Sequence, residues 1–381
     1  MSRNPAQQVY PGLFQFNGGS WHPCVFPASL TSSARNVAAL LRTLAVAGSS
    51  LLLACGGGGG SGGGSTNVAT APPNLQPSTV QEALDQGIDR GVDGLFLYVE
   101  RADGSTVSIA AGTQDHNNTP ADPTALFKIA SVSKMFIATA ATQLIHLGIL
   151  RRDDTLVMWL PEIAARITNN QSITLENMLQ HRSGIPDFDS QPGFSWERSH
   201  TDVDRVLEYA LDLPADFAAN ARYQYSNTNY LLVAKILDAA LGYSHRQHIQ
   251  NFILDPLGMT NTHHLLGDIN ADLLVNGYWN GINKTTQDYV VPGGSMISTG
   301  RDIAVFLRAL ASGNLLSEEE QNTYAELYWF SHSGWLPGYQ SITNYEQSLD
   351  AIVVLFLNNT GGNSEEVIAE TYAQILRVLR Q

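Results

Sequence analysis

The sequence has 381 residues, of which 44% are hydrophobic and 15% are charged, and its formal net charge is −14. This length allows one large domain or two small ones. The acidity argues against nucleic-acid binding, since phosphate contacts need lysine and arginine, and it otherwise fits simple solubility. The only cysteines are Cys24 and Cys55, so no disulfide framework is expected. No metal-ligand motif occurs, and we expect neither a metal nor a cofactor.

The first part of the chain is expected to be an export signal. Residues 37–54 form an apolar run with arginines on its flank, too short and too interrupted for a membrane span. The run ends in LLAC at 52–55, which resembles the bacterial lipobox and implies lipidation of Cys55. A plain secretory signal with an incidental cysteine is the alternative. Because residues 1–34 lack signal character, our hypothesis is that translation begins near residues 30–37.

A stretch at 56–65 of almost pure glycine and serine predicts a flexible tether suited to holding a domain off a membrane. The predicted organisation is a signal segment at 1–54, a lipidated cysteine with its tether at 55–80, and one domain at 81–381. The implied location is the periplasmic side of a bacterial cell envelope, as a membrane-anchored lipoprotein. No residue pattern indicates an oligomeric state.

The domain is predicted to start with a β-hairpin. Its strands are expected at 94–100 and 105–110, because both segments are rich in apolar and β-branched residues. The turn signal Ala-Asp-Gly at 102–104 separates them.

A serine and a lysine then occur at the start of a predicted helix, 131–149. In the first turn of a helix, residues three apart share one face, so the Ser131 hydroxyl and the Lys134 amine would be neighbours. The helix N-terminus adds a positive field and free N–H donors that suit an oxyanion. Ser131 is therefore a candidate nucleophile and Lys134 its candidate base, although a serine here is also an ordinary N-cap.

Further helices are predicted at 175–179, 203–211 and 229–241. Tyr225 and Asn227 precede the last of these, in a loop that can project a phenol and an amide. A nearby lysine ammonium would lower the pKa of the phenol, so that Tyr225 could relay protons to the serine. The alternative is that Asn227 caps the helix and Tyr225 only packs.

The segment His332-Ser333-Gly334 is followed directly by Trp335. On an edge strand, a small residue and a glycine would let a substrate backbone lie alongside, as in β-augmentation. An ordinary glycine-containing turn is the alternative.

The chain is predicted to end in strands at 339–345 and 351–357 and an amphipathic helix at 364–379, with Ser364 as the N-cap. Strands at both ends around a helical middle indicate an α+β fold with an inserted helical lobe. The approximate bounds are 81–130 and 290–381 for the sheet lobe and 131–290 for the helical lobe.

Together these motifs resemble, in order and spacing, those of the serine β-lactamase and D-alanyl-D-alanine carboxypeptidase family. The motifs are Ser131-x-x-Lys134, Tyr225-x-Asn227 and His332-Ser333-Gly334. The resemblance covers about residues 80–381. It implies a β-lactamase/transpeptidase-like fold, in which helices flank an antiparallel sheet and the nucleophile lies where the sheet meets the helical lobe.

The resemblance also implies a role for each motif residue. Ser131 would form an acyl-enzyme that water hydrolyses, while Lys134 and Tyr225 would share the general base and acid work. The N–H groups of Ser131 and Trp335 would form the oxyanion hole. The substrate-binding residues implied are Asn227, His332, Ser333, Gly334 and Trp335. The segment 179–186 is interpreted as a structural turn.

Histidine at 332, where the family pattern has lysine, resembles the D-peptidase and esterase branches and weakens the expectation of strong β-lactam carboxylate binding. The predicted function is a serine hydrolase, DD-carboxypeptidase-like or D-peptidase-like, acting on peptidoglycan-type peptides. The alternatives are an esterase of the same fold or a weak β-lactamase, and then a catalytically idle binding protein. The intact Ser131, Lys134 and Tyr225 argue against an idle protein. The expected partners are a small-molecule or peptide substrate and a membrane.

Overall fold

The computed structural model describes residues 14–17, 20–23 and 76–381. The predicted apolar signal run, Cys55 and residues 56–75 of the tether lie outside these residues, and Val80, at the end of the predicted tether segment, already begins a helix. The two short segments, β1 (Phe14–Asn17) and β2 (Ser20–Pro23), pair with each other in antiparallel fashion. Residues 77–381 belong to one compact unit. No helix in the described part of the chain is long and apolar enough to cross a membrane.

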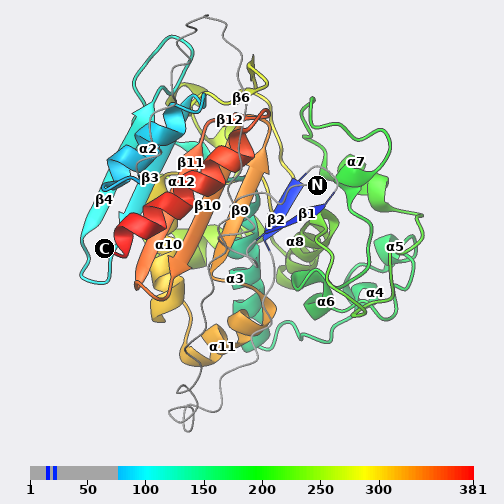
Figure 1. Cartoon of the computed structure of the whole chain (residues 1–381). Helices are drawn as coiled ribbons and strands as arrows, with labels where there is room; N and C mark the ends of the chain where they lie inside the picture. The colour runs from blue at the N-terminus through cyan, green and yellow to red at the C-terminus, as the bar shows by residue number, and fades with distance from the viewer. Residues whose placement is uncertain (1–13, 18–19, 24–75) are drawn as a thin grey trace, which may run out of the picture. The chain divides into compact units, whose positions relative to one another are not determined.

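A five-stranded sheet, in the order β4-β3-β11-β10-β9, lies at the centre of this unit, and every neighbouring pair is antiparallel (Figure 1). The predicted strands are confirmed, and the strand expected at 105–110 extends to Gly112. The His-Ser-Gly segment lies on β9, at an edge of the sheet, as expected. The strands are β3 (Gly94–Glu100), β4 (Thr106–Gly112), β9 (Ser331–Leu336), β10 (Tyr339–Glu346) and β11 (Ala351–Leu357).

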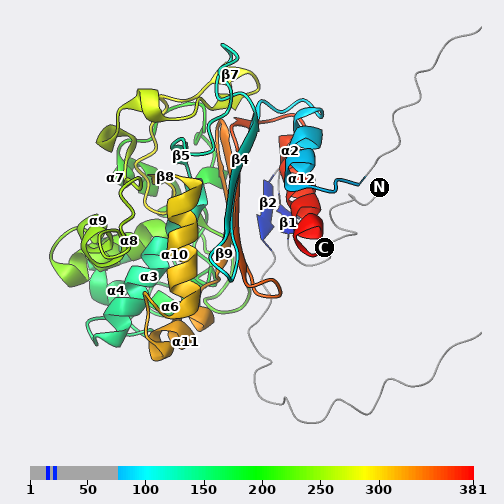
Figure 2. The same ribbon diagram turned by 90° about the vertical axis from the view of Figure 1, so that its left-hand side faces the viewer.

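Helices cover both faces of the sheet, which explains why all seven residues of β11 are buried. Figure 2 shows α2 (Val80–Ile88) and α12 (Ser364–Leu379) on one face, and α10 (Gly300–Ser312) and α3 (Ser133–His146) on the other. The alternating side chains of β11 therefore enter two separate apolar cores.

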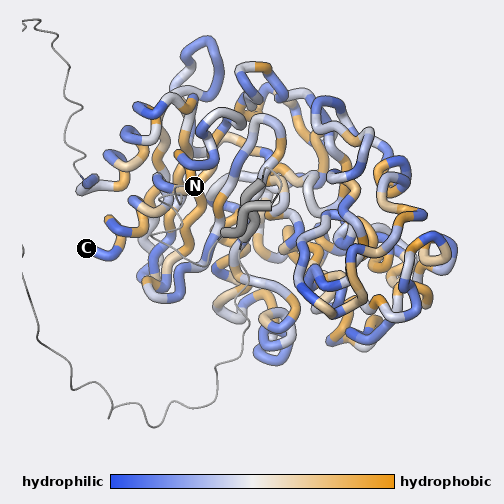
Figure 3. The backbone as a smooth tube through the Cα atoms, turned by 45° about the vertical axis from the view of Figure 1, so that its right-hand side comes forward, coloured by the Kyte–Doolittle hydropathy of each residue, from blue (hydrophilic) through white to orange (hydrophobic). Residues whose placement is uncertain are grey.

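The remaining elements lie mostly between α3 and α10 in the sequence, and apart from the helices Asn227–Leu241 and Glu318–Leu327 they are short. Figure 3 shows apolar residues running along the sheet strands and through this helical region. The helices are α4 (Leu156–Trp159), α5 (Pro161–Ala164), α6 (Leu175–Leu179), α7 (Val203–Leu207), α8 (Asn227–Leu241), α9 (His245–Ile249) and α11 (Glu318–Leu327). The minor strands are β5 (Phe127–Lys128), β6 (Tyr278–Trp279), β7 (Ile282–Asn283), β8 (Ile297–Ser298) and β12 (Asn359–Thr360).

Helix ends differ from the predictions in specific ways. The N-cap of α12 is Asn363, so the prediction of Ser364 as the cap is wrong. Ser364 is the first helical residue, and its Oγ accepts a hydrogen bond from Gln340 Nε2 at 2.7 Å, which ties the helix to β10. The helix expected over 203–211 changes to a 3₁₀ turn after Leu207.

Candidate active site

Ser131 lies in a 3₁₀ turn, Ala130–Val132, between β5 and α3, and α3 itself begins at Ser133. The serine therefore precedes the α-helix and is not in its first turn. Ala130 has φ of +51°, an unusual value for a residue with a side chain. Ser133 stabilises the turn, because its Oγ donates to Ala130 O at 2.7 Å and accepts from Met296 N at 3.2 Å. Ser131 is left half-buried.

Lys134 lies in the first turn of α3, is fully buried and contacts the serine directly. Its Nζ donates to Ser131 Oγ at 3.0 Å, to Asn227 Oδ1 at 2.8 Å and to Gly293 O at 2.9 Å. Burial lowers the pKa of Lys134 to about 7, and two nearby carboxylates oppose that shift. A large share of the lysine is thus neutral near pH 7 and able to accept the serine proton.

Tyr225 reaches the same hydroxyl from the loop before α8. Its OH donates to Ser131 Oγ at 3.1 Å, and its ring stacks on His181 with centroids 4.3 Å apart. The prediction of a lowered phenol pKa is wrong, because desolvation raises the pKa of Tyr225 well above its ordinary value. The phenol therefore stays protonated and suits a proton donor.

Asn227, the first residue of α8, connects the lysine to two acids. Its Oδ1 accepts from Lys134, while its Nδ2 donates to Asp187 Oδ2 at 3.2 Å and to Asp189 Oδ2 at 3.1 Å. The N-cap position of α8 belongs to Ser226, so Asn227 is not the cap. Its role in orienting a substrate stays a prediction.

Sequence reasoning missed the two acids and His181. Asp187 and Asp189 lie just after the segment interpreted as a structural turn, at the 3₁₀ turn Phe188–Ser190. Desolvation raises the pKa of both carboxyl groups, and their mutual repulsion adds to the shift at Asp187. His181 is fully buried, and its Nδ1 accepts from Ser226 N at 3.2 Å. The available signal was a pair of carboxylates two residues apart, on either side of Phe188.

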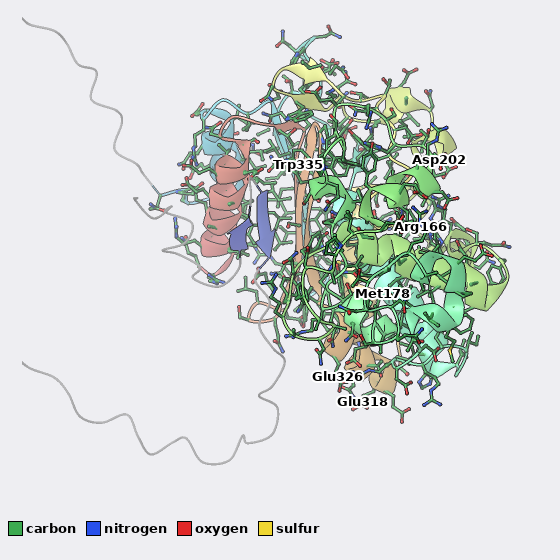
Figure 4. The ribbon with its side chains drawn as sticks, turned by 90° about the vertical axis from the view of Figure 1, so that its right-hand side faces the viewer. Arg166, Met178, Asp202, Glu318, Glu326 and Trp335 are labelled. Carbon is green, nitrogen blue, oxygen red and sulfur yellow. The ribbon has the colours of Figure 1, made fainter. Side chains whose placement is uncertain are left out.

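The edge strand β9 presents backbone groups beside the nucleophile. Tyr345 N donates to Phe330 O at 3.1 Å, and Gly334 pairs with Ser341, so even-numbered residues of β9 form the ladder with β10. The Trp335 N–H consequently points off the free edge, as an oxyanion donor must. Figure 4 marks Trp335 at this edge, beside the helical segments.

Gly334 permits the close approach of β9 to the nucleophile turn, by which we mean the 3₁₀ turn Ala130–Val132 that holds Ser131. A Cβ at this position would lie 2.3 Å from Ser341 Oγ and 2.5 Å from Ile129 O. The glycine is thus required by packing against the residues that precede Ser131. Contact between Gly334 and a substrate backbone stays a prediction.

Aromatic rings surround the side chains of two further β9 residues, His332 and Trp335. His332 is nearly buried, with its ring stacked on Tyr328 at 5.8 Å and 6.3 Å from the ring of Tyr225. The half-buried Trp335 packs edge-to-face on Trp196 at 6.3 Å and on Trp279 at 6.1 Å. His332 and Trp335 therefore lie among other aromatic rings.

The structure joins the predicted Ser131, Lys134, Tyr225 and Asn227 in one hydrogen-bonded group, and it packs the β9 motif against their turn. A serine hydroxyl that contacts both a neutral amine and a protonated phenol has a base and an acid within reach. This arrangement suits nucleophilic acyl transfer.

Comparison with known proteins agrees with this chemistry. The family model described as Beta-lactamase matches residues 78–328. The putative penicillin-binding protein PbpX of Bacillus subtilis is 27% identical over 257 residues, 62% of this chain and 63% of that protein. The chain thus spans less than two thirds of that relative's length.

Two solved structures show the same fold. D-amino acid amidase from Ochrobactrum anthropi SV3, complexed with D-phenylalanine, has a TM-score of 0.71 and 25% identity, covering 79% of this chain and 98% of that one. EstCE1, a hydrolase with promiscuous acyltransferase activity, has a TM-score of 0.62 and 19% identity, covering 77% and 97%.

Proposed function

The chain belongs to the β-lactamase family of serine hydrolases, and from this premise we propose that it cleaves D-amino-acid peptides or amides through an acyl-enzyme on Ser131. The proposal covers DD-carboxypeptidase-like and D-peptidase-like activity on peptidoglycan-type peptides. The single observation that carries it is the Ser131 Oγ, which lies 3.0 Å from Lys134 Nζ and 3.1 Å from Tyr225 OH. The penicillin-binding and D-amino acid amidase relatives support the substrate class.

In the first step, neutral Lys134 takes the proton of Ser131 as Oγ attacks the scissile carbonyl carbon. The N–H groups of Ser131 and Trp335 stabilise the oxyanion that forms. Tyr225 donates its proton to the leaving amine as the bond to carbon breaks, and the ammonium of Lys134 restores the phenol. Water then attacks the acyl-enzyme, gives up a proton to the same groups, and releases the acid and Ser131.

Esterase activity is the second candidate, and the surroundings of His332 favour it. The imidazole is nearly buried among aromatic rings, and its Nδ1 contacts Ser333 O on the same strand. A substrate carboxylate would gain less there than from an extended lysine, whereas a neutral ester needs no such charge. The likeness to the fold of EstCE1 is compatible with this alternative.

A substrate panel separates these candidates. We would measure kcat/KM for a D-Ala-D-Ala peptide, a D-amino acid amide, a short-chain nitrophenyl ester and a chromogenic cephalosporin, with Ser131→Ala as the blank. We expect the highest value for the peptide or the amide. Preference for the ester would favour the esterase, and no turnover or acylation with any substrate would contradict both candidates.

We further propose that the protein is anchored on the periplasmic side of a bacterial envelope through lipid on Cys55. The support is the apolar run at 37–54, the LLAC sequence that ends at Cys55, and the glycine- and serine-rich stretch after it.

A further inference from the structure

We infer that Asp187 and Asp189 are positioning residues that hold the Lys134 amine against Ser131 through Asn227 and stabilise its ammonium form. This inference rests on the proposed acyl-transfer chemistry of Ser131. Both carboxylates accept from the same amide nitrogen, Asn227 Nδ2, at 3.2 Å and 3.1 Å. The oxygen of that amide accepts from Lys134 Nζ at 2.8 Å, and the lysine contacts the Ser131 hydroxyl.

The neighbours of Asn227 allow only one orientation of its amide. The ammonium form of a lysine has only donors, so the atom facing protonated Lys134 must be the oxygen. A carboxylate has only acceptors when it is ionised, so the atom facing the aspartates must be the nitrogen. The acids therefore fix the direction of the amide, and the amide oxygen fixes where the amine points.

The carboxylate pair is held by the same helix that carries the amide. Phe188 N donates to Thr228 Oγ1 at 3.0 Å, and Thr228 Oγ1 donates to Pro186 O at 2.8 Å. Thr228 follows Asn227 in α8, and the Phe188 side chain is buried. The acids and the amide thus form one rigid unit, as a positioning function requires.

The charge of Asp187 and Asp189 also stabilises the ammonium form of Lys134. Lys134 gains a proton when Ser131 attacks, and burial opposes the ammonium, whereas Asp187 and Asp189 favour it. The other titratable groups that face the lysine are Tyr225 and Tyr230, whose ring centroids lie 5.2 Å and 5.9 Å from Nζ.

Beyond these groups, His181 and His332 border the ring of Tyr225. Both tyrosine hydroxyls have pKa values raised by desolvation, so they supply no negative charge near neutrality. The ionised form of the aspartate pair is therefore the source of compensating charge for the lysine.

The test uses full-length protein and the rate at which a fluorophosphonate labels Ser131, measured by intact mass from pH 5 to 9. Attack needs neutral Lys134, so the wild-type rate should rise with pH through about 7. In the double variant Asp187→Asn/Asp189→Asn, loss of the negative charges lowers the lysine pKa. The midpoint should then fall by about one pH unit or more. The plateau rate should fall about tenfold or more, because the amide loses its charged acceptors.

A control variant and two single variants show whether the shift in midpoint comes from Asp187 and Asp189. Asp212→Asn removes a charge from an exposed carboxylate that pairs with Arg166, and it should leave the midpoint unchanged. The isosteric single variants Asp187→Asn and Asp189→Asn retain an oxygen acceptor for Asn227, and each should give part of the shift. They decide the outcome if thermal unfolding shows that the double variant is not folded.

The labelling experiment distinguishes a failure of the proposed function from a failure of the positioning inference. Absence of labelling at Ser131 in the wild type would contradict the proposed function. Normal labelling with an unmoved midpoint in the double variant and in both single variants of Asp187 and Asp189 would overturn the positioning inference alone. This holds even if the plateau rate fell.

Discussion

At the scale of single residues, burial gives the two neighbours of Ser131 different tasks. Burial disfavours the charged form of any side chain, so it lowers the pKa of Lys134 and raises that of Tyr225. Near pH 7 the phenol is consequently neutral, and so is a large share of the amine. A neutral amine is a base and a neutral phenol is an acid, so one physical cause supplies both partners that acyl transfer needs.

Tyr225→Phe tests the acid role, because it removes the hydroxyl and keeps the ring on His181. We expect kcat to fall by roughly 10²–10⁴, the usual contribution of a general acid–base group, with a smaller change in KM. The measurement is steady-state kinetics on the best substrate of the panel. A kcat within about threefold of wild type would mean that Tyr225 serves only in packing.

The residues of the site differ in how far the sequence could reveal them. Ser131, Lys134 and Tyr225 follow from motif spacing, and the structure brings them into contact as predicted. Asp187 and Asp189 could not be identified, because their approach to Asn227 depends on how the preceding loop packs on α8. The pKa of Tyr225 was predicted in the wrong direction, because sequence shows a charged neighbour but not the loss of solvent.

At the scale of elements, the site depends on the contact between β9 and the nucleophile turn. Gly334→Ala places a methyl group 2.5 Å from Ile129 O, a backbone atom that cannot move without shifting the turn. We expect the free energy of unfolding to fall by about 1–3 kcal/mol, as for other overpacked positions. The rate of Ser131 labelling should fall as well.

Gly267→Ala is the matched control, since its added methyl group meets no atom within 4 Å. Denaturant unfolding and labelling kinetics of both variants measure the effect. Equal stability and equal labelling rates for the two variants would show that β9 does not constrain the turn.

The strands were predicted more accurately than the helix ends. The apolar strands β3 and β11 carry long hydrophobic runs that sequence shows directly, and both were placed correctly. The sequence does not predict the 3₁₀ turns around Ser131 and after Leu207. Tertiary hydrogen bonds, such as the one that Met296 N donates to Ser133 Oγ, influence where a helix starts.

At the scale of the whole molecule, the sheet joins distant parts of the chain. Strand β3 pairs with β11, and Phe96 lies opposite Phe356. The strands at both ends of the predicted domain were expected to share a sheet, and this expectation is confirmed. The order of the strands in the sheet is not among the predictions, since strand pairing depends on contacts far apart in sequence.

The proposed lipid on Cys55 would anchor this hydrolase to a membrane. Cys55→Ser removes the thiol that would carry lipid, so the protein should be released from membranes or should retain its leader. Fractionation of the bacterial host and intact mass of the mature chain measure both effects. Unchanged membrane retention together with unchanged processing would contradict lipidation at Cys55.

Ser131 is the proposed nucleophile, and covalent labelling is the direct test of that role. Wild-type protein and Ser131→Ala are treated with a fluorophosphonate, and intact mass is measured, with circular dichroism to compare their folds. We expect the wild type to gain the mass of one phosphonyl group and folded Ser131→Ala to gain none. Equal labelling of the two proteins would contradict it.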